Sequence, residues 1–140
     1  MVLYFPSFSL FSTSSFPQVK IFSSQTDQVV KTLSNFKDTA YSASFRRDGQ
    51  LLVSGGAEGL VRIYNVSTKS VMRTCRGHTG AVNVARFLIN GTEVMSGGND
   101  KTVRLFDVAK EEETLRIQEH EVSGEDLYIK GWGWKHDTVL

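Results

Sequence analysis

The feature that most constrains this chain is an internal repeat with a spacing of 42 residues. Residues 61–66 (VRIYNV) return 42 positions later as residues 103–108 (VRLFDV), and residues 54–56 (SGG) return as residues 96–98. No gap is needed to align these segments. A unit of this length cannot bury its apolar face alone, so neighbouring copies must stack on one another. The sequence therefore predicts an array of similar units.

The repeat continues on both sides of these two copies. Moving 42 residues back from Val61 reaches Val19, which begins a similar strand, and moving forward from His78 reaches His120. These registers divide the chain into an atypical N-terminal segment (1–17), a partial first unit (18–35), two full units (36–77 and 78–120) and a non-repeat tail (121–140). Because the array is incomplete at both ends, we expect a truncated piece of a longer protein.

Each full unit has the pattern of four short β-strands. Alternating, β-branched-rich segments predict strands at 41–45, 51–54, 60–65 and 71–75, and in the next unit at 82–87, 93–96, 102–107 and 114–118. Arg47-Asp48-Gly49 and Asn90-Gly91 are hairpin signals between the first two strands of each unit. No long helical pattern lies between residues 40 and 118. Four antiparallel strands per repeat indicate a propeller blade, so the predicted fold class is all-β.

Composition narrows the classes of function. The formal net charge of +1 gives no strong overall field that would attract nucleic acid, membranes or acidic ligands. The single cysteine, Cys75, cannot form an internal disulfide, which favours a reducing compartment. No stretch is long and apolar enough to span a bilayer. Residues 1–16 lack a basic start and contain Pro6, so we do not expect a secretory signal.

One unit carries a recognisable motif, formed by Gly77-His78, Ser96, Asp100 and Phe106-Asp107. It resembles a WD repeat, whose pattern opens with Gly-His and closes with Trp-Asp. The resemblance implies an incomplete WD-repeat β-propeller, with two full four-stranded antiparallel blades and part of a preceding blade. It also implies a structural triad, in which Asp100 accepts from His78 and His78 bonds onward to Ser96. Phe106 has no indole N–H to donate, so a triad rather than a tetrad is expected.

The preceding unit departs from that pattern. Phe36 stands at the histidine position and Glu58 at the aspartate position, while Ser54 is kept. Tyr64 and Asn65 occupy the aromatic-acid positions that Phe106 and Asp107 occupy in the next unit. We therefore expect this blade to depend more on apolar packing than on a buried polar network.

A closer likeness within the WD-repeat family extends from about residue 19 to about residue 120. It is carried by residues 36–41 (FKDTAY), 45–49 (FRRDG), 51–53 (LLV), 77–79 (GHT) and 103–107 (VRLFD). These segments resemble the first blades of nucleolar scaffolds in the small-subunit processome, which transcribes and processes precursor ribosomal RNA. The resemblance implies a protein–protein scaffold in ribosome biogenesis, in the nucleus and nucleolus, with protein partners in a ribonucleoprotein assembly. It allows weak or indirect RNA contact and implies no membrane partner. A generic WD-repeat adaptor outside the nucleolus is the alternative.

The same motif contains the residue types of a hydrolytic triad, which gives a remote alternative based on His78, Ser96 and Asp100. Catalysis would need an accessible serine beside an oxyanion hole, and the chain has no Gly-x-Ser-x-Gly elbow. Cys75 and His78 have a Cys-x-x-His spacing, but a second such pair is missing, so no zinc site is expected. The glycine-rich loop at residues 54–59 leads into a strand rather than a helix, so no cofactor site is expected. We predict no catalytic, cofactor-binding or metal-binding residues.

Two sets of side chains are relevant to binding, one to RNA and one to further copies of the chain. Eight arginines are expected at solvated strand and loop positions; the alternative, if the parent scaffold touches RNA, is that some of them meet phosphates. They are Arg46, Arg47, Arg62, Arg73, Arg76, Arg86, Arg104 and Arg116. Apolar strand positions with no polar cap predict self-association through open blade faces. These positions are Phe45, Val61, Ile63, Phe87, Val103 and Leu105.

Overall fold

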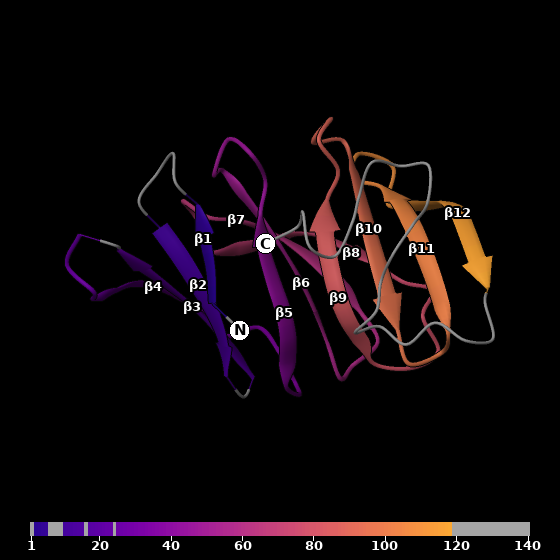
Figure 1. The fold of residues 1–140 in the computed structure, drawn as a ribbon, viewed down its shortest axis with the longest axis horizontal. Helices are drawn as coiled ribbons and strands as arrows, with labels where there is room; N and C mark the ends of the chain where they lie inside the picture. Colours follow the sequence, from indigo (N-terminus) through magenta and orange to yellow (C-terminus); the bar gives the residue numbers. More distant parts are fainter. Residues whose placement is uncertain (1, 6–9, 16, 24, 119–140) are drawn as a thin grey trace.

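The computed structural model describes residues 2–5, 10–15, 17–23 and 25–118. Within these ranges the chain forms three four-stranded antiparallel sheets that follow one another through the molecule (Figure 1). The described residues contain strands and turns without a helix, and hence without a helix able to cross a membrane. The predicted all-β class is confirmed.

The strands follow the chain order within every sheet. The first sheet contains β1 (Val2–Phe5), β2 (Leu10–Ser15), β3 (Gln18–Ser23) and β4 (Val29–Leu33). The second contains β5 (Ala40–Phe45), β6 (Leu51–Gly56), β7 (Val61–Asn65) and β8 (Ser70–Cys75). The third contains β9 (Val82–Phe87), β10 (Glu93–Gly98), β11 (Thr102–Asp107) and β12 (Glu112–Gln118). The second and third sheets begin 42 residues apart, in agreement with the repeat.

The first sheet is larger than the sequence predicts. The repeat pattern places only residues 18–35 in this unit, which corresponds to β3 and β4. In the structure β2 pairs with β3, and β1 pairs with β2, so the backbone of the atypical N-terminal segment supplies two further strands. The free edge of β3 explains this, because strand pairing satisfies its N–H and C=O groups. The tail at 121–140 lies outside the described residues.

The 42-residue period also governs backbone conformation. The turn between the third and fourth strands of each sheet contains one left-handed residue that is not glycine. These residues are Asp27 (φ 53°), Lys69 (φ 61°) and Glu111 (φ 60°). Each donates its N–H to the carbonyl oxygen four residues earlier, at 2.9 Å. The same turn is therefore built three times from different side chains.

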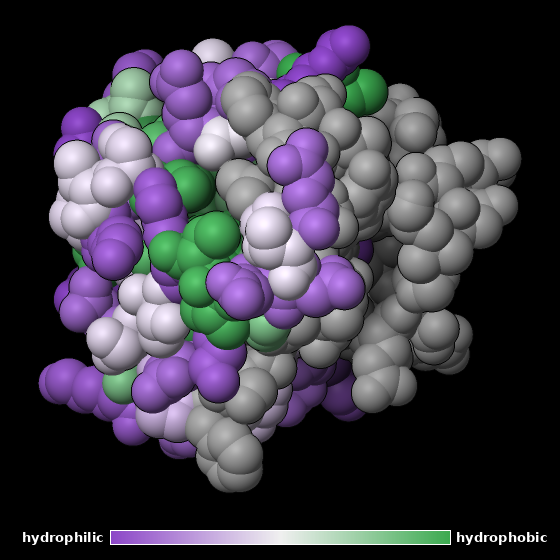
Figure 2. Space-filling view, turned by 90° about the vertical axis from the view of Figure 1, so that its left-hand side faces the viewer, coloured by the Kyte–Doolittle hydropathy of each residue, from purple (hydrophilic) through white to green (hydrophobic). Residues whose placement is uncertain are grey.

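The outer strand of each sheet carries a bulge at the same repeat position. One extra residue interrupts the pairing of β4 with β3, of β8 with β7 and of β12 with β11. The extra residues are Val30, Met72 and Thr114. Bulges bend an exposed edge and discourage further strand pairing. Val29 and Val30 are nevertheless 45% and 46% exposed, and Figure 2 shows a small apolar patch bordered by hydrophilic side chains on the side nearest β4.

Apolar side chains fill the space between successive sheets. Val19, Ile21 and Leu33 of the first sheet pack against a cluster from the second sheet that includes Phe45 and Tyr64. Their counterparts one repeat later form the equivalent contact between the second and third sheets: Val61, Ile63 and Cys75 pack with Val82, Ala85, Val94 and Phe106. Complete burial of a side chain of this size contributes about 1.5–3 kcal/mol. These two layers therefore hold the three sheets together.

The next set of counterparts has no described partner sheet. Val103 and Leu105 cluster with Met95, and Ile117 packs partly against them. Every described member of this cluster belongs to the third sheet. This face occupies the repeat position at which the other two sheets receive their neighbour.

A basic side chain on the outer strand adds a tie between sheets. Lys31 Nζ of β4 donates to the carbonyl oxygen of Val66 in the second sheet at 2.6 Å. One repeat later, Arg73 of β8 lies 3.7 Å from the Glu111 carboxylate in the third sheet. The following repeat position is Leu115, which cannot make such an ion pair.

Candidate functional site

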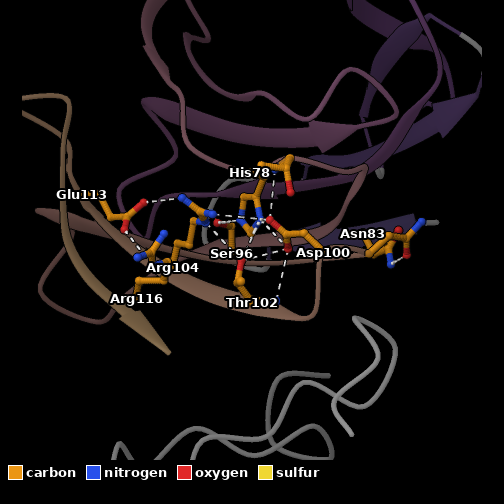
Figure 3. A network of polar contacts seen from close by, with 10 residues as sticks. His78, Asn83, Ser96, Asp100, Thr102, Arg104, Glu113 and Arg116 are labelled. Atoms are coloured by element: carbon orange, nitrogen blue, oxygen red, sulfur yellow. Dashed lines mark hydrogen bonds and ion pairs between the residues drawn. The ribbon is translucent and has the colours of Figure 1, made fainter. Parts of the chain in front are cut away.

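The structure brings His78, Ser96 and Asp100 together between the second and third sheets. His78 lies in the connection from β8 to β9, Ser96 on β10 and Asp100 in the turn from β10 to β11. His78 Nδ1 is 3.0 Å from both carboxylate oxygens of Asp100, and its Nε2 is 2.7 Å from Ser96 Oγ. Figure 3 shows the imidazole ring between these partners. The three residues form a continuous hydrogen-bonded chain.

The partners of His78 define its protonation. Asp100 is an acceptor, so Nδ1 carries the proton, and Nε2 then accepts from the Ser96 hydroxyl. Burial lowers the pKa of His78 below its usual 6.5, and it outweighs the opposing effect of the hydrogen bond to Asp100. The neutral ring is therefore the form that this site holds at neutral pH.

Asp100 is the centre of the site. Burial by itself would raise its pKa, but hydrogen bonds from Thr102, His78 and the Thr79 backbone lower it to about 2. Thr102 Oγ1 donates to Oδ1 at 2.8 Å, and Thr79 N donates to Oδ2 at 3.1 Å. The carboxylate is thus charged and fully engaged, with its side chain only 5% exposed.

The network continues beyond the residues that the motif predicted. Arg104 Nε donates to Thr102 Oγ1 at 3.0 Å, and Arg104 Nη1 donates to Glu113 Oε2 at 2.6 Å (Figure 3). Arg104 Nη2 also lies 3.5 Å from Asp100 Oδ2. These contacts join the β10–β11 turn to β11 and β12. The sequence carried one signal for them, since Arg62 and Arg104 recur at the repeat spacing, each four residues after the acid.

The structure corrects the expectation of solvated positions for three of the eight arginines, Arg62, Arg86 and Arg104. Arg104 is only 5% exposed, and the Arg62 side chain is 11% exposed. Arg62 and Arg104 were expected at solvated positions, but each is ion-paired, and the carboxylates compensate for the lost hydration. Arg86 was also expected to be solvated, but its Nε is buried without a hydrogen-bond partner among the described residues, and burial lowers its pKa.

The equivalent site of the second sheet keeps the acid and loses the imidazole. Glu58 accepts from Lys37 N at 2.5 Å and pairs with Arg62 at 2.6 Å, as Asp100 does with Thr79 N and Arg104. The Arg62 hydrogen bond is the main reason why the pKa of Glu58 is lowered. Phe36 packs on Tyr64 with ring centroids 5.6 Å apart. Apolar packing replaces the ring's hydrogen bonds, but the polar anchor on the loop remains.

The aromatic-acid positions have separate tasks. Tyr64 and Phe106 are fully buried in the layers between sheets. Asn65 Oδ1 accepts from Ser67 N at 3.0 Å, and Asp107 Oδ1 accepts from Ala109 N at 2.9 Å. The aromatic residue therefore fills the core, and the following polar residue closes the turn to the outer strand.

The triad has no route to a substrate in this structure. Ser96 and the His78 side chain are both 0% exposed, whereas a nucleophilic serine must contact a carbonyl carbon. Cys75 is buried, and burial raises its pKa to about 11, which disfavours a thiolate ligand. No group of three candidate metal ligands occurs among the described residues. The arrangement is suited to joining loops and sheets.

Comparison with known proteins agrees with this architecture. The family model described as "WD domain, G-beta repeat" matches residues 19–65 and 69–107, more than half of the chain. The chain therefore belongs to the WD-repeat family, whose repeats form propeller blades. A solved structure described as "Structure of U3-55K" shares the fold with a TM-score of 0.78 over 86% of this chain and 39% of that chain, at 17% identity.

Sequence comparison also finds individual proteins that are similar to this chain. U3 small nucleolar RNA-associated protein 15 of Saccharomyces cerevisiae is 61% identical over 51 residues, which is 36% of this chain and 10% of the relative. The Schizosaccharomyces pombe protein of the same name is 47% identical over 51 residues, and the human homolog is 41% identical over 49 residues. The chain thus spans about a tenth of these relatives.

Proposed function

We propose that this chain is a non-catalytic WD-repeat scaffold that binds proteins of a ribosome-biogenesis assembly in the nucleolus. The observation that carries the proposal is the 61% identity to U3 small nucleolar RNA-associated protein 15 of Saccharomyces cerevisiae. That name places the relative with the U3 small nucleolar RNA. Family proteins with this fold present loops and edges from a rigid β-scaffold, which is how a propeller serves protein recognition.

The triad supports this proposal through its position. The hydrogen bonds of the triad residues run to one another and to nearby backbone. We therefore assign a structural role to His78, Ser96 and Asp100. Their bonds tie the β8–β9 connection to the β10–β11 turn, and both of these loops lie on the surface at one end of the sheets. A fixed loop geometry lowers the entropy lost when a partner binds.

A capture experiment tests the nucleolar assignment. The tagged 140-residue chain is incubated with nuclear extract, and bound proteins are quantified against a WD-repeat fragment of similar size from an unrelated protein. We expect selective enrichment of small-subunit processome proteins and nucleolar signal when the chain is expressed in cells. Equal recovery by both fragments would remove the nucleolar assignment and leave the generic WD-repeat adaptor. Turnover of ester or peptide substrates that is lost in Ser96→Ala would revive the hydrolase alternative.

Self-association belongs to the same proposal. The positions expected on open blade faces are mostly buried in the structure: Phe45, Val103 and Leu105 are 8%, 9% and 6% exposed, and Val61 and Ile63 are fully buried. Apolar side chains that do reach the surface include Val29 and Val30 of β4, which are 45% and 46% exposed. Apolar surface of this kind favours association of chains. Sedimentation velocity over a range of concentrations should show species larger than the monomer; a single monomeric species throughout would contradict this.

A further inference from the structure

One end of the third sheet presents three exposed cations. Arg76 directly follows β8, and the adjacent Gly77 lies against Arg104 and Glu113 of the third sheet. Lys101 precedes β11, and Arg116 lies near the end of β12. Because adjacent strands run antiparallel, the start of β9, the turn between β10 and β11 and the end of β12 lie at the same end of the sheet. We call this set, Arg76, Lys101 and Arg116, the basic corner.

The carboxylates beside the basic corner are already engaged. Asp100 is surrounded by His78, Thr102 and the Thr79 backbone, and Glu113 accepts from Arg104 at 2.6 Å. Arg116 Nε is 3.9 Å from Glu113, a long contact for an ion pair, and the Arg116 side chain is 57% exposed. With Arg104 included, four cations stand against two carboxylates, Asp100 and Glu113, among the described residues at this end of the third sheet, so positive charge is in excess.

The basic corner is specific to the third sheet. The corresponding positions of the second sheet, 42 residues earlier, are Ser34, Gly59 and Thr74. Lys101 keeps the left-handed conformation of its counterpart, with φ 60° against 75° in Gly59. Glycine adopts this conformation without steric cost, whereas a lysine does not. Lys101, like Lys69, is thus a lysine at a turn position that glycine would occupy more easily.

The neighbouring surface has the character of a nucleic-acid interface. Exposed Thr79 and Asn99 lie beside the cations in the two loops. Leu115 is the exposed large apolar residue nearest in sequence, and as the strand neighbour of Arg116 it points to the opposite face of β12. Protein interfaces need apolar or aromatic anchors, whereas phosphate backbones are bound by basic and small polar side chains.

We infer that the basic corner binds the phosphate backbone of an RNA strand. The inference rests on the proposed function, because it names the RNA-facing surface of that scaffold. Arg76, Lys101 and Arg116 contact phosphates, and Thr79 and Asn99 supply hydrogen bonds. Such contacts are independent of base sequence and weaken with salt.

The test replaces each cation by the residue that the second sheet carries. The variant Arg76→Ser/Lys101→Gly/Arg116→Thr thus uses side chains that the repeat already accommodates. The control Arg47→Ser/Lys69→Gly/Lys110→Ser removes three exposed charges at the opposite end of the sheets and also replaces a left-handed lysine. Binding of the full chain to a fluorescent oligouridine strand is measured by anisotropy at several KCl concentrations, and circular dichroism checks folding.

We expect wild type and the control to bind alike and the basic-corner variant to bind at least about tenfold more weakly. The slope of log affinity against log salt should fall by about 2, since each phosphate contact on a single strand contributes about 0.7. Lys101→Gly alone, which relieves backbone strain, should lower the slope by about 0.7 if the triple variant fails to fold. Absence of wild-type binding, or equal losses in both triple variants, would overturn the inference.

A phosphoserine peptide is the competing probe. Binding of that peptide, lost in the basic-corner variant while oligouridine does not bind, would assign the corner to a phosphorylated protein and overturn the RNA inference. The proposed scaffold function is judged separately, by capture of processome proteins. Capture without oligouridine binding removes only the inference, and oligouridine binding without capture removes only the nucleolar scaffold.

Discussion

The second and third sheets build the same loop junction with different chemistry. In both, an acid (Glu58 or Asp100) accepts a backbone N–H from the incoming loop and pairs with an arginine four residues later. The ring between the loop and the sheet is Phe36 in one and His78 in the other. The shared acid and arginine are what the junction requires, whereas the ring can be apolar or polar.

The ring at this position determines whether the buried serine hydroxyl beneath it has a hydrogen-bond partner. Ser96 Oγ has an imidazole nitrogen at 2.7 Å, but its counterpart Ser54 Oγ has no hydrogen-bond partner among the described residues. Tyr64 Oη in the second sheet also lacks one. The third sheet thus contains a connected hydrogen-bond network. In the second sheet, packing of Phe36 on Tyr64 takes the place of those hydrogen bonds. Mutations at equivalent positions of the two sheets test this contrast.

Removal of the acid should have the largest effect. Asp100→Ala leaves the His78 N–H, the Thr79 N–H and part of the Arg104 charge without a partner, so we expect a loss of about 3–5 kcal/mol in unfolding free energy. Glu58→Ala leaves the Lys37 N–H and the Arg62 guanidinium without this acceptor but frees no ring donor, so it should cost less, about 1–3 kcal/mol. Urea denaturation followed by circular dichroism measures both. Equal losses would mean that the imidazole adds nothing to the junction.

A side chain at Gly77 should be the next most harmful change. An added Cβ would lie 2.6 Å from Arg104 Nη1 and 2.8 Å from Glu113 Oε2, and it would push the ion pair apart. We expect Gly77→Ala to cost about 1–2 kcal/mol, because the two flexible side chains can shift only by loosening their ion pair and because L side chains rarely adopt the φ of 157° found here. Asn35→Ala, at the same position of the preceding repeat, is the matched control, and its urea midpoint should barely move. A harmless Gly77→Ala would show that the pair relaxes freely.

The paired serines give a more discriminating effect. Ser96→Ala leaves His78 Nε2 buried without a donor, and we expect a loss of about 1–2 kcal/mol. Ser54→Ala removes a hydroxyl that makes no described hydrogen bond, so its unfolding free energy should stay within about 0.5 kcal/mol of wild type. Thermal and urea unfolding of both variants provide the measurement. A greater loss in Ser54→Ala would contradict the contrast between the sheets.

The dependence of stability on pH should show the smallest effect. The folded pKa of His78 lies below 6.5, so the unfolded chain binds its proton first. The stability that the neutral ring confers is complete above pH 6.5 and falls as the pH drops below it. Asp100, with a pKa of about 2 against 3.8, loses its contribution only below about pH 4. His78→Phe, which copies Phe36, should flatten the curve just below pH 6.5; an unchanged slope there would exclude His78 as its source.

The repeat made much of this molecule predictable. A gapless 42-residue spacing with strand patterning gave eight strands close to their observed bounds, because alternation and turn residues are local signals. The Gly-His to Phe-Asp spacing singled out His78, Ser96 and Asp100, which the structure brings within hydrogen-bonding distance. The two N-terminal strands were not predicted, because residues 2–15 lack a matching repeat signal, and their pairing with β3 is seen only in the fold.

The amino-acid sequence specifies the repeat unit, that is, its period, its strands, its turns and the residues of its motif. Which charged groups are buried between units and which remain at the surface becomes visible in the folded molecule alone. Arg62 and Arg104 are ion-paired in the interior, whereas Arg76 and Arg116 are exposed. The physical reason is that desolvation and pairing depend on groups brought together from different strands, and the spacing of residues along the chain does not contain that information.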